Sequence, residues 1–291
     1  GHGPQGARPG RRRRLRLARL HAGNARRRNP PPPAGAESGT VEAGIEQTKS
    51  SLSHIPNMTW NLSQLRDNVA TQHGDAQLEH LSPSLNSIVD RQIYARFHFQ
   101  EANRILNELL KDRDDQSILI DLVFGADREA HHEFANSRRF AEAHITACVQ
   151  SLHSLSDILA HAIYYALGLN LDDATKLRPN RIYLHVVKPL LPAGKMSFLI
   201  QELVEHADYR YLADIVNHSK HRRVVQTPYT VDVTGTATPP HGLKFAAFVY
   251  DGRAYPARWV YPFVESEYSR QSDLITRIGE LLNEFVSKQG N

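Results

Sequence analysis

Apolar side chains recur at helical spacings along most of the chain from residue 84 onward. Spacings of four and three over 84–111 predict an amphipathic helix. A longer pattern covers 126–168, where no Pro or Gly occurs before Gly168. Its apolar seam is Ala141, Ile145, Cys148, Leu152, Leu155, Leu159, Ala162, Ala166 and Leu169. We therefore expect one continuous helix ~60 Å long, packed at a shallow angle against near-parallel neighbours.

The rest of the pattern is shorter and changes period near the C-terminus. The apolar run 118–124 is ambiguous between a helical turn and a buried strand, and 181–191 is a short mixed segment. Helical spacing returns in three segments: 196–207, 209–221 and 266–287. Between the last two, alternation predicts a strand in 224–233 and a hairpin of 245–250 with 254–259. Asp251-Gly252 is the two-residue turn of that hairpin, and Pro256 makes its second strand an edge strand.

These elements predict a mainly α fold. We expect an antiparallel helical bundle of four or five helices, with a small antiparallel β-hairpin or three-stranded sheet before the C-terminal helix. Residues 84–287 should form one domain, because so few strands are not stable alone. Residues 46–83 are expected to be a partly ordered lead-in, and 1–45 a disordered basic tail rich in Arg, Pro and Gly.

Charge is distributed very unevenly along the chain. Residues 1–40 hold ten arginines and a single acid, Glu37, a net charge of +9. Because the whole chain carries +4, the remaining residues carry −5. The pI near 9.2 therefore belongs to the tail, and the folded part is mildly acidic.

Three interpretations of the tail compete. It could be an RNA-binding arm, or an organellar targeting peptide, although the serines and amphipathic helix of such peptides are absent. It could also be non-native, translated from GC-rich DNA upstream of the true start, since the first methionine is Met58. We favour the third hypothesis, with translation beginning near Met58, or at Val41 if the start codon is non-standard.

The compartment is suggested by cysteine content and hydropathy. Cys148 is the only cysteine, which excludes an internal disulfide and suits a reducing environment. No apolar run reaches the ~20 residues that a membrane span needs, and no secretory signal is visible. We expect a cytoplasmic protein without membrane contact.

One helical segment carries an unusual set of polar residues. In helical geometry Arg210, Asp214, Asn217 and His221 share a face, and Lys220 and Arg222 add charge at the C-terminal end. This face could bind a phosphate or position a water for general acid/base work, and these six residues are our predicted binding site. The alternative is an ordinary solvated helix face, or a buried network that fixes the helix against the bundle.

Other patterns predict neither a cofactor nor a metal. The chain has no Gly-rich phosphate loop, nucleophile elbow or paired carboxylates on a helix. His218 and His221 have a spacing that can bind zinc, but one pair supplies half of the usual ligand set. Cys148 lies in the apolar seam and is expected to be buried.

The chain resembles bacterial proteins of the HEPN-like helical-bundle type (higher eukaryote and prokaryote nucleotide-binding). The likeness covers about 84–287. It rests on helix order, on the Ser154-Leu-Ser-Asp-Ile-Leu159 segment, and on the helix end Asn217-His-Ser-Lys-His-Arg222. The resemblance implies a dimeric helical core, with roles in prokaryotic defence or stress response.

Some members of that family are metal-independent ribonucleases that carry a His four to six residues after an Arg. Arg138 and Arg139 followed by His144 fit this spacing, which makes them the weak catalytic candidates. We expect a binding or scaffold module that dimerises through the long-helix seam and binds a protein partner, a nucleotide or RNA. The alternative is a metal-independent endoribonuclease.

Overall fold

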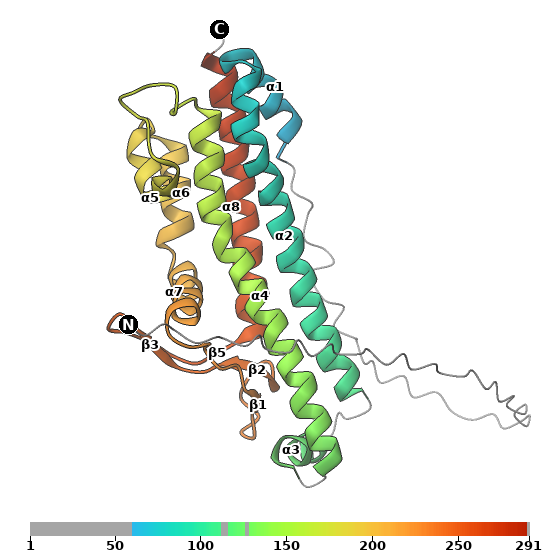
Figure 1. Ribbon diagram of the computed structural model, residues 1–291. Helices are drawn as coiled ribbons and strands as arrows, with labels where there is room; N and C mark the ends of the chain where they lie inside the picture. The colour runs from blue at the N-terminus through green and yellow to red at the C-terminus, as the bar shows by residue number, and fades with distance from the viewer. Residues whose placement is uncertain (1–59, 112–115, 126–127, 290–291) are drawn as a thin grey trace, which may run out of the picture. The chain divides into compact units, whose positions relative to one another are not determined.

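The computed structural model describes residues 60–111, 116–125 and 128–289, so the predicted tail 1–45 and the proposed start at Met58 lie outside it. Three long helices form the core: α2 (Asp75–Leu110), α4 (Arg128–Ala166) and α8 (Val260–Gln289). They lie side by side, with α2 running opposite to α4 and α8 (Figure 1). The mainly α bundle is confirmed, with its small antiparallel strands just before the last helix.

The long helix α4 is continuous, as the seam predicted. Every seam residue from Ala141 to Ala166 is at most 2% exposed, and Leu169 packs against the same core. Helices α2, α5 (Leu184–Val187), α7 (Ala207–His221) and α8 cover the seam within one chain. The expectation that the seam joins two chains is therefore wrong, since Leu152 has no exposed surface to offer.

Helix α2 begins at Asp75, nine residues before the predicted start. The predicted helix began where regular apolar spacing starts, near Leu85, and a proline lacks the N–H that a helix interior uses. The helix nevertheless continues through Pro83, and Leu81 and Leu85 on either side of it are fully buried. Burial on both sides offsets the lost hydrogen bond.

The described part of the lead-in, 60–83, is ordered and joins the core. It contains α1 (Leu62–His73), which Asn61 caps by accepting a hydrogen bond from the Gln64 amide. Gly74, at φ 85°, separates α1 from α2, a backbone angle that glycine adopts without strain. Helix α1 packs on α2 and α8, with Leu65 and Val69 fully buried.

Trp60 fixes this N-terminal end to the last helix. Its indole N–H donates to Asn283 Oδ1 at 3.2 Å, and the Asn283 amide donates to the Asn61 carbonyl at 2.9 Å. The indole ring lies directly on Gly279, where an added Cβ would be 2.1 Å from Trp60 Cδ2. Only a glycine leaves room for the ring at this position.

Short helices line the other side of α4. After α3 (Gln116–Phe124), which resolves the ambiguous run 118–124 as helix, the segment 179–190 forms α5 between two 3₁₀ turns, η2 (Pro179–Arg181) and η3 (Lys188–Leu190). Helix α6 (Lys195–Glu205) is followed directly by α7, as the two predicted segments indicated. His206 separates them and caps α7.

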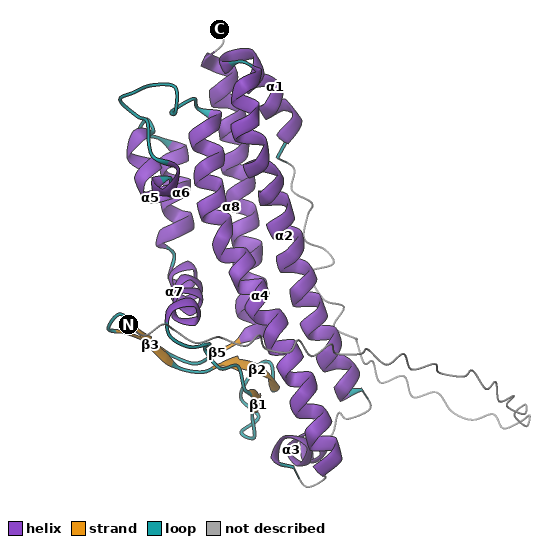
Figure 2. Ribbon diagram, viewed as in Figure 1, coloured by secondary structure: helices purple, strands orange, loops and turns teal. Residues whose placement is uncertain are grey.

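The strands form two small antiparallel sheets (Figure 2). One has the order β1 (Tyr229–Val231), β2 (His241–Phe245), β5 (Arg258–Trp259), and the other pairs β3 (Phe248–Tyr250) with β4 (Arg253–Tyr255). The predicted turn is confirmed, with Asp251 and Gly252 both at positive φ. The predicted strands were too long: Pro256 ends β4, and the residues after it pair with β2 instead.

Helix α8 starts at Val260, six residues earlier than predicted. Pro262 is in its first turn, where the missing N–H has no helical partner to lose. Among the described helices, none combines the length and apolarity required to cross a bilayer.

Candidate functional site

The predicted binding face of α7 is partly exposed and partly built into the fold. Arg210, Lys220 and His221 are exposed, and their side chains make no hydrogen bond or ion pair within the described residues. Asn217 is half-buried. Asp214, only 15% exposed, has a different role because it faces the β3–β4 hairpin.

Contacts with that hairpin could not be seen from the helix alone. Asp214 accepts a short hydrogen bond from the Tyr255 hydroxyl, and Arg253 Nη1 lies 3.6 Å from its Oδ2. Arg222 donates to Asp251 at 2.7 Å, and its guanidinium lies 4.8 Å from the Tyr250 ring centroid. The predicted site therefore divides into residues that hold the hairpin and residues that face solvent.

The C-terminal end of α7 is closed by a buried histidine. His218 is 5% exposed, and its Nδ1 lies 2.7 Å from the Arg223 carbonyl oxygen. This contact holds the chain where it leaves the helix. Within the described residues, His218 and His221 do not belong to any group of three potential metal ligands.

Helix α7 also packs against α4, where it contacts His153 of that helix. The His153 ring stacks on Tyr209, with centroids 6.3 Å apart and planes 12° apart, and the Tyr209 hydroxyl is hydrogen-bonded to Ser156 Oγ. Burial lowers the pKa of His153, Asp157 and Asp214 oppose that shift, and Lys220 adds to it. Burial also raises the pKa of Tyr209 to about 12. Both groups are therefore neutral at physiological pH.

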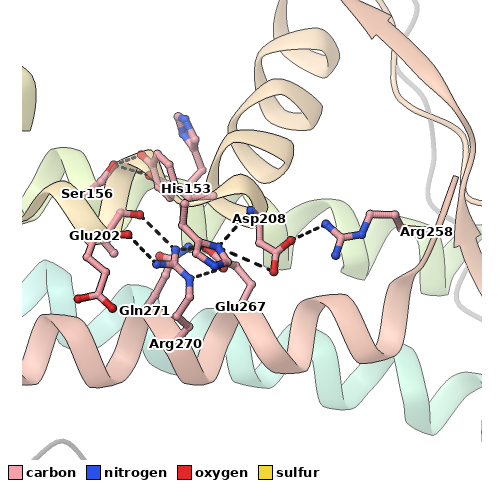
Figure 3. Close-up of polar contacts among 11 residues, drawn as sticks. His153, Ser156, Glu202, Asp208, Arg258, Glu267, Arg270 and Gln271 are labelled. Atoms are coloured by element: carbon pink, nitrogen blue, oxygen red, sulfur yellow. Dashed lines mark hydrogen bonds and ion pairs between the residues drawn. The ribbon is translucent and has the colours of Figure 1, made fainter. Parts of the chain in front are cut away.

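A buried ion pair on α8 connects this helix to α6 (Figure 3). Glu267 on α8 has no exposed surface, and Arg270 contacts both its carboxylate oxygens at 2.7 and 2.8 Å. Gln271 donates a third hydrogen bond to Glu267 at 2.8 Å. Arg270 also donates to the carbonyls of Glu202 and Leu203, in the last turn of α6. This pair was not predicted from the sequence, because its role depends on the packing of α6 against α8.

The same place holds a group that could in principle bind a metal. His206, Asp208 and Glu267 offer atoms within 4.8 Å of one another. However, Glu267 is already bound by Arg270, and Asp208 Oδ1 by Arg258 at 2.6 Å. Two guanidinium groups oppose a cation here, so we interpret this cluster as a structural junction.

The candidate catalytic residues lie on α4, and two of them have side-chain partners. Arg138 is paired with Glu142 at 3.1 Å, one turn along the helix. The Nδ1 atoms of His144 and His98 are 3.0 Å apart, which sequence reasoning missed because His98 belongs to α2. Burial lowers the pKa of His98, and the neighbouring His144 adds to the shift. One imidazole can therefore donate to the other only when the acceptor is neutral.

Cys148 is fully buried, as its place in the seam predicted, and burial raises the pKa of its thiol.

No family model, curated protein or solved structure matches this chain.

Proposed function

We propose that this chain is a HEPN-like binding module that recognises the phosphates of a nucleotide or of single-stranded RNA. The family and its role in prokaryotic defence or stress response come from the sequence resemblance. The recognising surface in this proposal is the basic end of α7, defined as Lys220, His221, Arg222 and Arg223 with Arg253 of β4.

One observation carries the proposal: exposed cations gather at this end of α7, within a part of the chain that is mildly acidic overall. All five residues of the basic end are exposed, whereas residues 41–291 together carry −5. Asp214 and Asp251 neutralise only part of this charge. A local excess of positive charge attracts phosphate and releases the counterions condensed on it.

Aromatic side chains beside the cations favour a nucleic acid over another polyanion. Tyr250 lies under the Arg222 guanidinium, and Tyr255 lies beside Arg253. Proteins that bind single strands combine a basic track with aromatic rings on which bases stack. The Arg222 guanidinium already stacks on the Tyr250 ring. In this proposal, an RNA base stacks on the same pair of side chains.

The test compares two full-length variants by fluorescence anisotropy with a short labelled single-stranded RNA at several salt concentrations. Lys220→Ala/Arg223→Ala removes two cations from the basic end, while Lys111→Ala/Arg178→Ala removes two exposed cations from elsewhere. Both retain the tail, so its contribution cancels. The slope of log K against log salt is negative, and we expect the first variant to lower its magnitude by about 1.4, two contacts at ~0.7 each for a single strand. Equal affinities and slopes for the two variants would reject the proposal.

We also propose that the chain works as a homodimer, as the resemblance implies. Because the seam is buried, we place the dimer interface on the outer face of α2 and α4 instead. Three large apolar side chains are exposed there: Ile93, Phe97 and Phe140, at 50, 52 and 64%. Light scattering of Phe97→Ser/Phe140→Ser should give half the mass of the wild-type chain. A wild-type monomer would reject the dimer, and a dimeric variant would reject this surface.

A second candidate function is a metal-independent endoribonuclease, and the contact between His98 and His144 favours it. Two imidazoles in hydrogen-bond contact can supply a general acid and a general base without a metal ion. If this is the function, RNA cleavage persists in EDTA and is lost in His144→Ala and in His98→Ala. Absence of cleavage by the wild-type chain would reject the enzyme.

A further inference from the structure

A cavity of about 500 Å³ lies where α2, α8 and the β1–β2 strands meet. Helix α2 supplies Phe99 and Asn103, the strands supply Tyr229 and His241, and α8 supplies Glu265 from its second turn. None of its lining residues belongs to α7, and neither His98 nor His144 is among them. The cavity is thus separate from the surface proposed above, and a test of one does not depend on the other.

The walls of this cavity are mostly apolar and aromatic. Phe99, Ala102 and Leu243 are buried core residues that also line it. The Phe99 and Tyr261 rings lie 5.1 Å apart with planes tilted by 39°. A cavity of this size, with apolar walls and a few polar groups, has the properties of a small-molecule site.

Two residues that line this cavity each carry a buried polar atom without a partner within the described residues. The atoms are Glu265 Oε1 and Asn103 Nδ2. Buried polar atoms in folded proteins nearly always have a hydrogen-bond partner, so an orphan of this kind calls for an explanation. Here the two residues, one with an acceptor and one with a donor, come from different helices and line the same cavity.

The charge of the lining indicates what could satisfy them. Glu265 is the only charged residue among the lining residues, which include no Lys or Arg. An anionic ligand would therefore meet a carboxylate and no cation. A cation would meet that carboxylate beside the faces of Phe99 and Tyr261, which attract positive charge.

We propose that this cavity binds a small organic ammonium compound with an apolar body. The ammonium group donates a hydrogen bond to the Glu265 carboxylate and contacts the Phe99 and Tyr261 rings. An acceptor atom elsewhere on the ligand takes the hydrogen bond that Asn103 Nδ2 offers. The apolar body fills the space against Ala102, Leu106 and Leu243.

The titration behaviour of the site agrees with its geometry. Burial raises the pKa of Glu265, while a hydrogen bond from Tyr261 opposes the shift. A bound ammonium group would stabilise the ionised carboxylate and lower that pKa again. Burial also raises the pKa of Tyr229, whose hydroxyl lies 2.6 Å from His241 Nδ1, so this wall carries no second negative charge.

The experiment uses the full-length chain and three probes that differ mainly in charge: 2-phenylethylammonium, 2-phenylethanol and 3-phenylpropanoate. Binding is measured by ligand-detected NMR and calorimetry at neutral pH. We expect the cation to bind with a Kd of ~1 mM or tighter for a ligand of this size, followed by the alcohol and then the anion. Failure of the cation to bind, or an anion that binds as tightly, would overturn the proposal.

Two isosteric variants assign the effect to the cavity. Glu265→Gln should weaken the cation about tenfold or more, as expected for a hydrogen bond between charged groups, and leave the alcohol unchanged. Glu280→Gln removes an exposed carboxylate of the same helix and should change neither. Equal loss in both variants would show that the cation binds by general surface charge, which rejects the site. Thermal unfolding of each variant establishes that it is folded.

Discussion

The contact of Trp60 with Gly279 allows a prediction in which the sign of a mutational effect reverses. In most helix interiors Gly→Ala stabilises, by about 1 kcal/mol, because alanine is the better helix former. At position 279 the new methyl group would lie 2.1 Å from the Trp60 ring, far inside contact distance. The Trp60 ring and the helix backbone at residue 279 therefore cannot both keep their positions.

The magnitude follows from what Trp60 would lose. The residue is 4% exposed and hydrogen-bonded to Asn283, and removing a buried Trp or Phe side chain costs about 3–5 kcal/mol. Displacement of the ring should cost most of that. Subtracting the helix-propensity gain of about 1 kcal/mol, we expect Gly279→Ala to lower the free energy of unfolding by about 2–4 kcal/mol.

Urea denaturation of four proteins tests this reasoning: the wild type, Gly279→Ala, Trp60→Ala and the double variant. Once the indole is absent the clash disappears, so Gly279→Ala should stabilise the Trp60→Ala protein by about 1 kcal/mol. Far-ultraviolet circular dichroism follows the unfolding of all four, because two of them lack Trp60. A Gly279→Ala effect of the same sign and size in both backgrounds would refute the packing argument.

Three further predictions concern buried groups. Glu267→Gln should lower the free energy of unfolding by about 3 kcal/mol in chemical denaturation, because it leaves the mostly buried Arg270 without its counter-charge. Glu267→Leu/Arg270→Met should recover much of this loss, and no recovery would argue against an ion-pair cause. The pKa of His153 is lowered on folding, so the unfolded chain binds the proton more tightly and stability falls as pH drops below about 6.5. His153→Gln should make that fall shallower in thermal melts from neutral to acidic pH, and an unchanged pH profile would contradict this. Cys148, fully buried with a raised thiol pKa, should react with a thiol reagent only at the rate of unfolding; rapid reaction of the native protein would refute its burial.

The parts of the fold that depend on local pattern were predictable from the sequence. Helix α4 could be predicted, because a long uninterrupted apolar seam leaves no competing interpretation. The starts of α2 and α8 were missed because the apolar spacing that indicated each helix begins further along the chain, at Leu85 and Leu274. Both helices extend back through a proline, Pro83 or Pro262, which burial or a first-turn position accommodates. Strand β2 was missed because its sequence, with Gly242 and Lys244, lacks a strand pattern, and it forms by pairing with β1 and β5.

The candidate site was predictable only as a helix face. The exposure of Lys220 and His221 follows from helical geometry, but the partners of Asp214 and Arg222 come from a hairpin about 30–40 residues away along the chain. His98 was likewise found only when α2 met α4. Orphaned atoms such as Glu265 Oε1 have no sequence signature at all, because they are defined by what surrounds them.

The hydrogen bond between Trp60 and Asn283 joins residues that are 223 positions apart. During synthesis on the ribosome, α1 and α2 emerge long before α8 is made. Until then, the apolar face of α1 that carries Leu65 and Val69 lacks the α8 surface against which it packs. A chain that stalls before α8 would display this face to chaperones and proteases. Packing of α1 into the bundle is thus coupled to translation of α8.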